Sequence, residues 1–292
     1  MSSDLPDVDQ SSAPPTAQDM TRTVAAFDSK ARAWEEYAVA PLGALRTNLA
    51  LHYLQLHVAS LPGANGLNVL DAGAGTGSYA LPLAQQGHRV CLLDLSGQML
   101  EVARSKAERL GPSLLGSSVL ERLDFRHAAV DEVSRLFPPD SFDIVLCHTL
   151  LEYVPDPSET LRDLSSVLRS GGLASVLFVT PYADALRWGL GRADVEMALQ
   201  ALDEPVSSAN TFGLDRRLMA PELVRQTMAG AGLTVVAEYG IRIFADHLPA
   251  EKLADPAFFT SLWELEVAAG HRDPYRQIGR YRQMIGRKLA AP

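Results

Sequence analysis

A glycine-rich turn between a predicted strand and a predicted helix is the part of this 292-residue sequence best suited to bind a small molecule. Residues 69–77 read VLDAGAGTG, so an apolar run reaches an acid, Asp71, and then turns. Glycine has no Cβ, which lets the backbone approach a ligand closely. The glycines of the turn are Gly73, Gly75 and Gly77. We therefore predict a ligand site at this turn.

A second acid indicates what kind of ligand this is. Residues 89–94 read RVCLLD, a short apolar run typical of a buried strand, and end in Asp94. An acid at the end of this next strand can accept hydrogen bonds from both hydroxyls of a ribose. The interval from Asp71 to Asp94 fits the roughly 20 residues expected of that arrangement. We predict a nucleoside-containing cofactor, against the alternative of a tight turn without a ligand.

The spacing of the glycines distinguishes two classes of cofactor. In dinucleotide-binding turns the third glycine follows the second by three positions, whereas these glycines alternate. The alternating pattern with Asp71 ahead of it resembles motif I of the class I S-adenosylmethionine-dependent methyltransferases. The resemblance implies that Asp71 and the glycines pass along the methionine half of S-adenosylmethionine, while Asp94 holds the ribose.

The composition suits a single enzyme domain in a reducing cytoplasm. With 47% hydrophobic residues, the chain is long enough for one large α/β core. We expect residues 1–20, which are polar, to form a disordered leader and residues 21–292 to form the methyltransferase domain. No apolar run approaches the length of a membrane span, so no membrane contact is expected. Cys91 and Cys147 fall in predicted buried strands, so neither a disulfide nor a metal site is expected.

Predicted strands and helices alternate along the chain, which indicates an α/β, doubly wound, mostly parallel sheet with ligands at the carboxyl ends of its strands. The resemblance implies seven strands of the Rossmann-like class I methyltransferase type, with the last strand antiparallel between the fifth and sixth. The predicted strands are residues 67–72, 89–94, 123–127, 142–148, 173–179, 233–244 and 276–287. The predicted helices are residues 28–53 (within N-terminal helices at 27–60), 78–86, 97–110 capped by Ser96, 157–169, 221–231 and 256–270. A small helical insertion, a cap or lid, is expected at about 181–220.

Several segments support a closer resemblance. They are HTLLEYVPDP at 148–157, GIRIFADHL at 240–248, ELE at 264–266, PY at 274–275 and GRY at 279–281. Over roughly residues 27–288 the chain resembles the bacterial tRNA 5-carboxymethoxyuridine methyltransferases. Members of that family convert the carboxylate of a modified wobble uridine into its methyl ester.

The closer resemblance also assigns cofactor contacts. It implies that Arg46 lies at the carboxylate of S-adenosylmethionine and that Gly73 and Ala74 lie under its methionine. It also implies that Asp94 binds the ribose. The remaining contacts that it implies are Val130 and Asp131 beside the adenine and His148 near the sulfonium edge.

A carboxylate acceptor places few demands on the protein. It is ionised at neutral pH and needs no general base, but it needs a cation to fix it. We predict that Arg242 grips it with both prongs and that Arg280 is a second clamp. The alternative for Arg242 is an ion pair on an edge strand. His148 could act as a base for a hydroxyl or amine acceptor, but packing against the cofactor is the preferred interpretation.

The charge pattern bears on the partner. Family members carry a lysine-rich run where this chain has residues 202–210, LDEPVSSAN, and the net charge of −9 argues against unspecific RNA binding. The C-terminal segment is basic, with Arg272, Arg276, Arg280, Arg282, Arg287 and Lys288 against Asp273. Tyr275 and Tyr281 could stack a flipped base of the tRNA anticodon region, or could belong to the core.

Three functions remain open from the sequence. The first is methylation of a tRNA wobble carboxylate, and the second is a small-molecule O- or carboxyl-methyltransferase acting on, for example, a small carboxylic acid. The third is a cofactor-binding regulator without turnover. Glu152 and Tyr153 are expected to line the pocket in any of these cases, although Glu152 could instead pair on the following helix.

Overall fold

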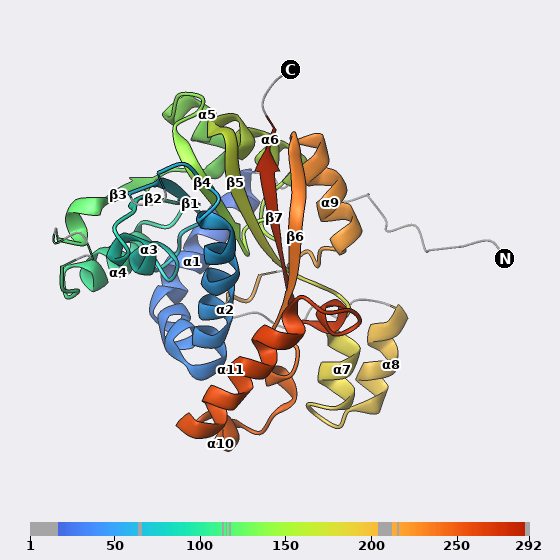
Figure 1. The fold of residues 1–292 in the computed structure, drawn as a ribbon. Helices are drawn as coiled ribbons and strands as arrows, with labels where there is room; N and C mark the ends of the chain where they lie inside the picture. The colour runs from blue at the N-terminus through green and yellow to red at the C-terminus, as the bar shows by residue number, and fades with distance from the viewer. Residues whose placement is uncertain are drawn as a thin grey trace.

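The computed structural model describes residues 17–63, 66–112, 114, 116, 118–203, 212–214 and 216–289, with only the backbone for residues 17–20. Within these residues, seven strands form one sheet in the order β3-β2-β1-β4-β5-β7-β6 (Figure 1). The strands are β1 Asn68–Ala72, β2 Arg89–Asp94, β3 Leu123–His127, β4 Phe142–His148, β5 Leu168–Val179, β6 Leu233–Ile241 and β7 Tyr281–Lys288.

The last strand, β7, is antiparallel to both of its neighbours, β5 and β6, while β1 to β5 pair in parallel. The expected doubly wound sheet with an antiparallel last strand is therefore confirmed. In Figure 1 the β7 arrow points up, so the carboxyl ends of the parallel strands lie on the lower side of the sheet. Parallel sheets bind ligands at this edge.

Helices cover both faces of the sheet (Figure 1). The longer ones are α1 Ala17–Val39, α2 Pro41–Val58, α4 Gly97–Ala107, α6 Pro157–Val167, α8 Val195–Asp203, α9 Pro221–Gly230 and α11 Pro256–Gly270. The shorter ones are α3 Ala80–Gln85, α5 Val133–Leu136, α7 Asp184–Gly189 and α10 Ala250–Leu253. Single 3-10 turns are η1 Leu120–Arg122, η2 Val130–Glu132, η3 Ala245–His247 and η4 Tyr275–Ile278.

Alternation along the strands builds two hydrophobic cores. Val69 of β1 packs with α2, α3, α4 and α11 on one face, and its neighbour Leu70 packs with α5, α6 and α9 on the other. Successive strand residues point to opposite faces, so strands buried on both sides are apolar throughout. This is why the strand segments could be recognised from short apolar runs.

Side-chain caps fix the starts of three helices. The Ser96 hydroxyl accepts a hydrogen bond from Met99 N (3.1 Å) at the start of α4, as expected. Asp156 and Asp255 cap α6 and α11 in the same way, each followed by a proline at the first helical position.

The expectation of one helix over residues 28–53 is wrong. Two helices, α1 and α2, meet at Ala40, and Pro41 opens the second. Proline lacks the N–H that a continuous helix would need there. Of the expected leader, residues 1–16 lie outside the described residues, and residues 17–20 belong to α1.

Other boundaries also differ from the predicted ones. Strand β5 begins at Leu168, where a helix end was expected, and β6 ends at Ile241 before the predicted residue 244. The closing strand β7 begins at Tyr281, because the turn η4 occupies the first part of the predicted segment. The expected insertion at 181–220 contains α7 and α8, while residues 204–211 and 215 lie outside the described residues.

In the described part of the chain, no helix is both long and apolar enough to cross a membrane.

Candidate active site

A cavity of about 540 Å³ opens at the carboxyl ends of the parallel strands. Its wall combines the glycine turn after β1, the end of β2, the loop after β4, and side chains from α1, α2 and the start of β7. This volume lies within the range usual for small-molecule sites. Segments far apart in sequence therefore converge on one pocket.

The glycine turn forms part of the cavity wall through Gly73 and Gly75, both with positive φ (71° and 52°). A Cβ at Gly75 would point toward Trp34 Nε1, 3.5 Å away, on the facing wall. Gly77 has a different role, since a Cβ there would lie 3.1 Å from the Ala103 Cβ of α4. It permits helix packing, and neither it nor the buried Ala74 is part of the wall.

Asp94 is held in the wall by two backbone donors. Its Oδ2 accepts from Gly75 N (2.7 Å) and its Oδ1 accepts from Ser96 N (2.8 Å). Each oxygen keeps a second lone pair for a hydroxyl of a bound ribose. Burial raises the pKa of Asp94, and the two N–H donors oppose that rise.

Asp71 lies behind the turn rather than in the cavity wall. It is fully buried, and neither of its carboxyl oxygens has a well-formed hydrogen bond among the described residues, with the Ala80 N–H as a nearby donor. Burial, and then the nearby Asp94, raise its pKa to about 7, which the Ala80 N–H opposes only in part. An unpaired carboxylate here suits a cationic ligand group on the other side of the turn.

Arg46, a residue of α2, lines another part of the cavity wall. Its guanidinium lies 5.1 Å from the Trp34 ring centroid and 5.6 Å from that of Tyr281, and its Nε has no partner among the described residues. A buried cation of this kind suits an anionic ligand group. With the glycine backbone and Asp94, it fits an amino-acid-linked nucleoside such as S-adenosylmethionine.

The cavity wall carries charges of both signs. Val130 and Asp131 of the η2 turn line it, and further acids in the wall include Asp156, Glu159 and Asp163. The arginines of the wall are Arg46, Arg216 and Arg280. An anionic acceptor would be attracted toward these arginines.

His148 is a buried side chain outside the cavity wall. Its Nε2 hydrogen-bonds the Ser175 hydroxyl (2.8 Å), and its ring packs edge-on against Tyr79. Burial, followed by Arg46, lowers its pKa to about 3. Its placement matches packing below the cofactor site better than the role of a base.

Arg242 is buried and already paired. Its Nε and Nη2 donate to the two carboxylate oxygens of Asp246, and its Nη1 donates to the Tyr37 hydroxyl (2.7 Å). It is not part of the cavity wall. The two-pronged face expected to grip an acceptor thus grips a side chain of the protein itself.

Arg280 has the free donors that Arg242 lacks. It lines the cavity, is mostly buried, and its Nε and Nη1 have no hydrogen-bond partner among the described residues. Buried guanidinium donors without acceptors are costly unless a ligand satisfies them. Arg280 is therefore the residue best placed to bind an anionic acceptor.

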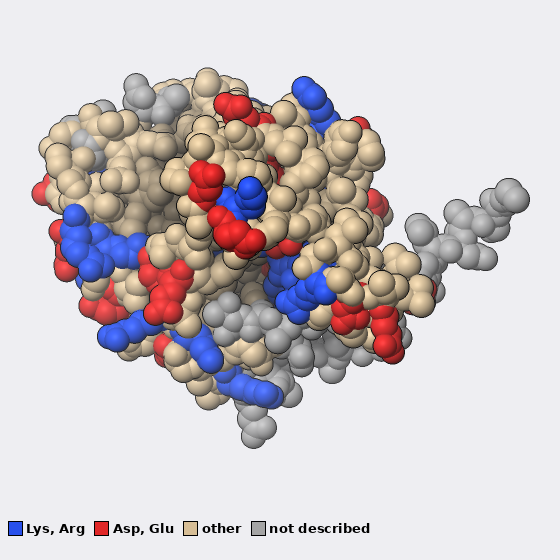
Figure 2. Space-filling view, turned by 90° about the horizontal axis from the view of Figure 1, so that it is seen from below, with Lys and Arg blue, Asp and Glu red and all other residues tan. Residues whose placement is uncertain are grey.

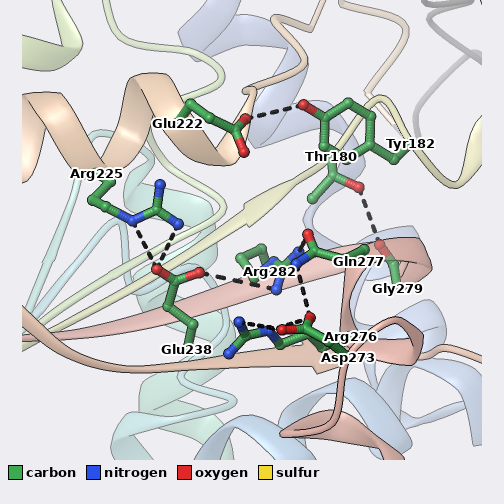
Figure 3. A network of polar contacts seen from close by, with 10 residues as sticks. All are labelled: Thr180, Tyr182, Glu222, Arg225, Glu238, Asp273, Arg276, Gln277, Gly279 and Arg282. Atoms are coloured by element: carbon green, nitrogen blue, oxygen red, sulfur yellow. Dashed lines mark hydrogen bonds and ion pairs between the residues drawn. The ribbon is translucent and has the colours of Figure 1, made fainter.

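The backbone around Arg280 is fixed from two sides. Thr180 donates from its hydroxyl to Gly279 O (3.0 Å) and from its N–H to Arg280 O (3.1 Å). The Arg280 N–H in turn donates to Arg242 O (3.2 Å). Figure 3 shows Thr180 reaching the chain just before β7.

A polar network braces the η4 turn that precedes Arg280 (Figure 3). Asp273 binds Arg276 through both of its oxygens (2.7 Å each), and Arg282 donates to Gln277 (2.6 Å). These contacts tie the turn to β7 from the side away from the cavity. By holding the turn, they favour a fixed position of the Arg280 backbone before any ligand binds.

The predicted C-terminal basic run does not form one face. Arg276 pairs with Asp273, Arg282 is buried, and Arg287 and Lys288 donate to backbone carbonyls of the neighbouring β5 segment. Only Arg280 of the six lines the cavity. Figure 2, seen toward the carboxyl ends of the strands, shows Lys and Arg interspersed with Asp and Glu.

The two C-terminal tyrosines also lie in different environments. Tyr275 is half exposed, whereas Tyr281 is buried in the cavity wall. The expected position of the lysine-rich run, residues 202–210, lies mostly outside the described residues.

Several wall residues were not predicted from the sequence. Phe27, Trp34 and Tyr37 of α1 line the cavity, and Phe27 and Trp34 contact Phe212. Their spacings of seven and three residues place them on one face of a helix, which was the available signal. Arg216, also in the wall, had no such signal. Glu152 and Tyr153 line the cavity as expected.

Among the described residues, no cluster of three or more His, Cys, Asp or Glu side chains could hold a metal ion. Both cysteines are free and buried, and burial raises the pKa of each thiol.

Methyltransferases are among the known proteins that resemble this chain in sequence and in fold. A methyltransferase domain family matches residues 70–176. The tRNA 5-carboxymethoxyuridine methyltransferase of Escherichia coli (strain K12) is 33% identical over 77% of this chain and 82% of its own length. A ubiquinone biosynthesis O-methyltransferase of Xanthomonas campestris pv. campestris (strain B100) is 38% identical over 50% of this chain and 56% of its own. The magnesium protoporphyrin IX methyltransferase of Synechocystis PCC 6803, solved with bound SAH, shares the fold at 16% identity, with a TM-score of 0.59 over 92% of this chain and 99% of its own.

Proposed function

Because this chain belongs to the class I S-adenosylmethionine-dependent methyltransferases, we propose that it methylates the carboxylate of 5-carboxymethoxyuridine at the wobble position of tRNA. The product is the methyl ester, and S-adenosylmethionine is the cofactor. The relative from Escherichia coli supports this choice of acceptor, since its name specifies that nucleoside. The reaction would take place in the cytoplasm, where tRNA is modified.

One observation carries the proposal: Arg280 lines the cavity that the glycine turn and Asp94 share, and its buried Nε and Nη1 have no hydrogen-bond partner among the described residues. The guanidinium of Arg280 carries a fixed positive charge and planar N–H donors, which suits a carboxylate acceptor. An anionic acceptor would be attracted by that charge and could accept from the guanidinium. A neutral hydroxyl would lack that attraction.

The proposed cofactor contacts come from this chain's own residues. Asp94 would accept from the ribose hydroxyls, Arg46 would bind the cofactor carboxylate, and the Gly73 and Gly75 backbone would pass along the methionine. Val130 and Asp131 would border the adenine. When bound, S-adenosylmethionine supplies a methyl group already activated by its sulfonium.

The remaining catalytic work is alignment and exclusion of water. Arg280 would hold one acceptor oxygen so that the other faces the methyl group. The aromatic side chains of α1 would keep that space dry. No base is needed, which agrees with the placement of His148 outside the wall. Arg242 would position Arg280 and Tyr37 rather than touch the acceptor.

The Arg280→Lys variant tests the proposal. Lysine keeps the charge but loses the planar guanidinium donors, so kcat/KM for tRNA methyl ester formation is expected to fall about 10- to 100-fold, equivalent to one charged hydrogen bond. Cofactor affinity is expected to stay unchanged. Arg126→Lys, at an exposed arginine on β3, is the matched control and should behave like the wild type. Equal activity of the Arg280→Lys variant would contradict the assigned role.

A second candidate function also has a specific observation in its favour. Glu152 lines the cavity and has one buried carboxyl oxygen without a hydrogen-bond partner among the described residues, and a carboxylate there could act as base for a hydroxyl acceptor. The ubiquinone biosynthesis O-methyltransferase relative supports that alternative. A rate that rises with pH through neutrality on a small hydroxylated acceptor, without ester formation on tRNA, would favour it.

A further inference from the structure

Glu152 is a buried carboxyl group that the proposed reaction does not yet use. It follows β4, lines the cavity, and is only 4% exposed. Its Oε1 accepts from Val179 N (2.8 Å) at the carboxyl end of β5. Its Oε2 has no hydrogen-bond partner among the described residues. The strand thus fixes one oxygen and leaves the other for a ligand.

The groups around Glu152 come from several elements. Burial raises the pKa of Glu152 to about 7. The Val179 N–H, the N–H of Glu152 itself, Arg216 just before α9 and Arg46 of α2 oppose that rise. Cys147 of β4 and Tyr153 are its other titratable neighbours. Tyr281 of β7 also lines the cavity, and the surrounding arginines lower its pKa against the effect of burial.

An anionic acceptor would favour the protonated form of Glu152 over the ionised form. The carboxylate held by Arg280 would enter the same low-dielectric cavity, where an ionised Glu152 would repel it. A protonated Glu152 would instead donate a hydrogen bond to it. The fixed Oε1 leaves Oε2 as the oxygen that carries the proton.

We propose that Glu152 is a specificity residue for the acceptor carboxylate. In its neutral, protonated form, Glu152 donates a hydrogen bond from Oε2 to one oxygen of that carboxylate, while Arg280 binds the carboxylate as well. This inference rests on the proposed function. Binding of the acceptor then takes up one proton, and affinity falls as pH rises above the pKa of the free enzyme. The methyl ester product has no charge to retain that proton, which favours its release.

The test is binding calorimetry on the full chain saturated with S-adenosylhomocysteine. The titrant is an anticodon stem-loop with 5-carboxymethoxyuridine at the wobble position, used in two buffers of different ionisation enthalpy. Wild type is expected to take up about one proton per bound stem-loop above pH ~8, and its affinity should fall about tenfold per pH unit there. A stem-loop carrying the methyl ester should show neither effect.

Glu152→Gln is the informative variant. Its amide oxygen can still accept from Val179 N, and its NH₂ donates where Oε2–H did. Proton uptake should disappear, and affinity should become independent of pH. Tyr281→Phe removes another titratable group of the wall and should leave the uptake in place.

Three results would overturn the inference, and they differ from one another. Uptake that persists in Glu152→Gln would assign the proton elsewhere. Unchanged binding with turnover lost about 100-fold or more in Glu152→Gln would make Glu152 a base. Failure of the wild type to bind the carboxylate stem-loop would remove the proposed function itself, and the inference with it.

Discussion

The two arginines expected to hold the acceptor carboxylate differ in what already surrounds them. Arg242 binds Asp246 through its two-pronged face, whereas Nε and Nη1 of Arg280 are buried without a hydrogen-bond partner among the described residues. The sequence could identify both as candidate cations, but not their partners. The difference depends on the pairing of Arg242, just after β6, with Asp246, four residues further along the chain. Arg242 has a positive φ of 59° at this position.

At the same scale, Asp94→Ala should weaken the affinity for S-adenosylhomocysteine. It removes a charged acceptor for the ribose hydroxyls, worth roughly 1.5–3 kcal/mol, or about 10- to 100-fold in affinity. Asp124→Ala, which removes an exposed acid on the neighbouring strand β3, is the control. Titration calorimetry measures both. A folded Asp94→Ala protein with wild-type affinity would remove the ribose from this strand end.

At the scale of elements, the strands and the glycine turn were predictable and the connections between them less so. The strands predicted at 89–94 and 142–148 match β2 and β4 because buried strands need mostly apolar runs. The strand predicted at 123–127 matches β3, an edge strand with no fully buried residue. The break between α1 and α2 and the late start of β7 depend on Pro41 and on the η4 turn. Only tertiary packing decides how such turns join the sheet.

The Arg242 and Asp246 pair ties the end of β6 to η3 and, through Tyr37, to α1. Removing one partner, as in Arg242→Met, leaves a buried unpaired carboxylate, so unfolding in urea should show a loss of about 3–5 kcal/mol. Adding Asp246→Asn should restore part of that stability. The exposed pair of Arg126 and Asp124 is the control, where Arg126→Met should cost under about 1 kcal/mol.

Equal stabilities of Arg242→Met and the wild type, together with a large fall in turnover, would contradict this structural role. That outcome would indicate that Arg242 binds the acceptor.

At the scale of the whole molecule, the site depends on residues that the sequence keeps far apart. Trp34, Arg46, Asp94, Arg216 and Arg280 meet at one sheet edge. The glycine turn and Asp94 could be predicted because the βα unit brings them together locally. Arg216 and the aromatic face of α1 could not, because their approach depends on how α1 and the segment before α9 pack over that edge.

The stability of the ligand-free protein should depend on pH through Asp71. Its folded-state pKa, about 7, lies above its unfolded value near 3.8. Its contribution to stability is therefore complete below the unfolded pKa and is lost as pH rises through about 7. Asp71→Asn should stabilise the protein by about 2–4 kcal/mol at pH ~8, with the difference closing toward pH ~4.

Urea unfolding across this pH range measures the effect, with the exposed Asp124→Asn as control. A less stable Asp71→Asn protein at high pH would show instead that the carboxylate is paired in the folded state.

The central claim is that the acceptor is a carboxylate on a wobble uridine, and one measurement tests it most directly. Purified protein and S-adenosylmethionine are incubated with tRNA that carries 5-carboxymethoxyuridine, and the wobble nucleoside is analysed by mass spectrometry. The account predicts conversion to the methyl ester, with a rate that does not rise with pH through the histidine range because no base is used. Unchanged 5-carboxymethoxyuridine at saturating cofactor, with methylation of a hydroxylated small molecule in a parallel reaction, would contradict it.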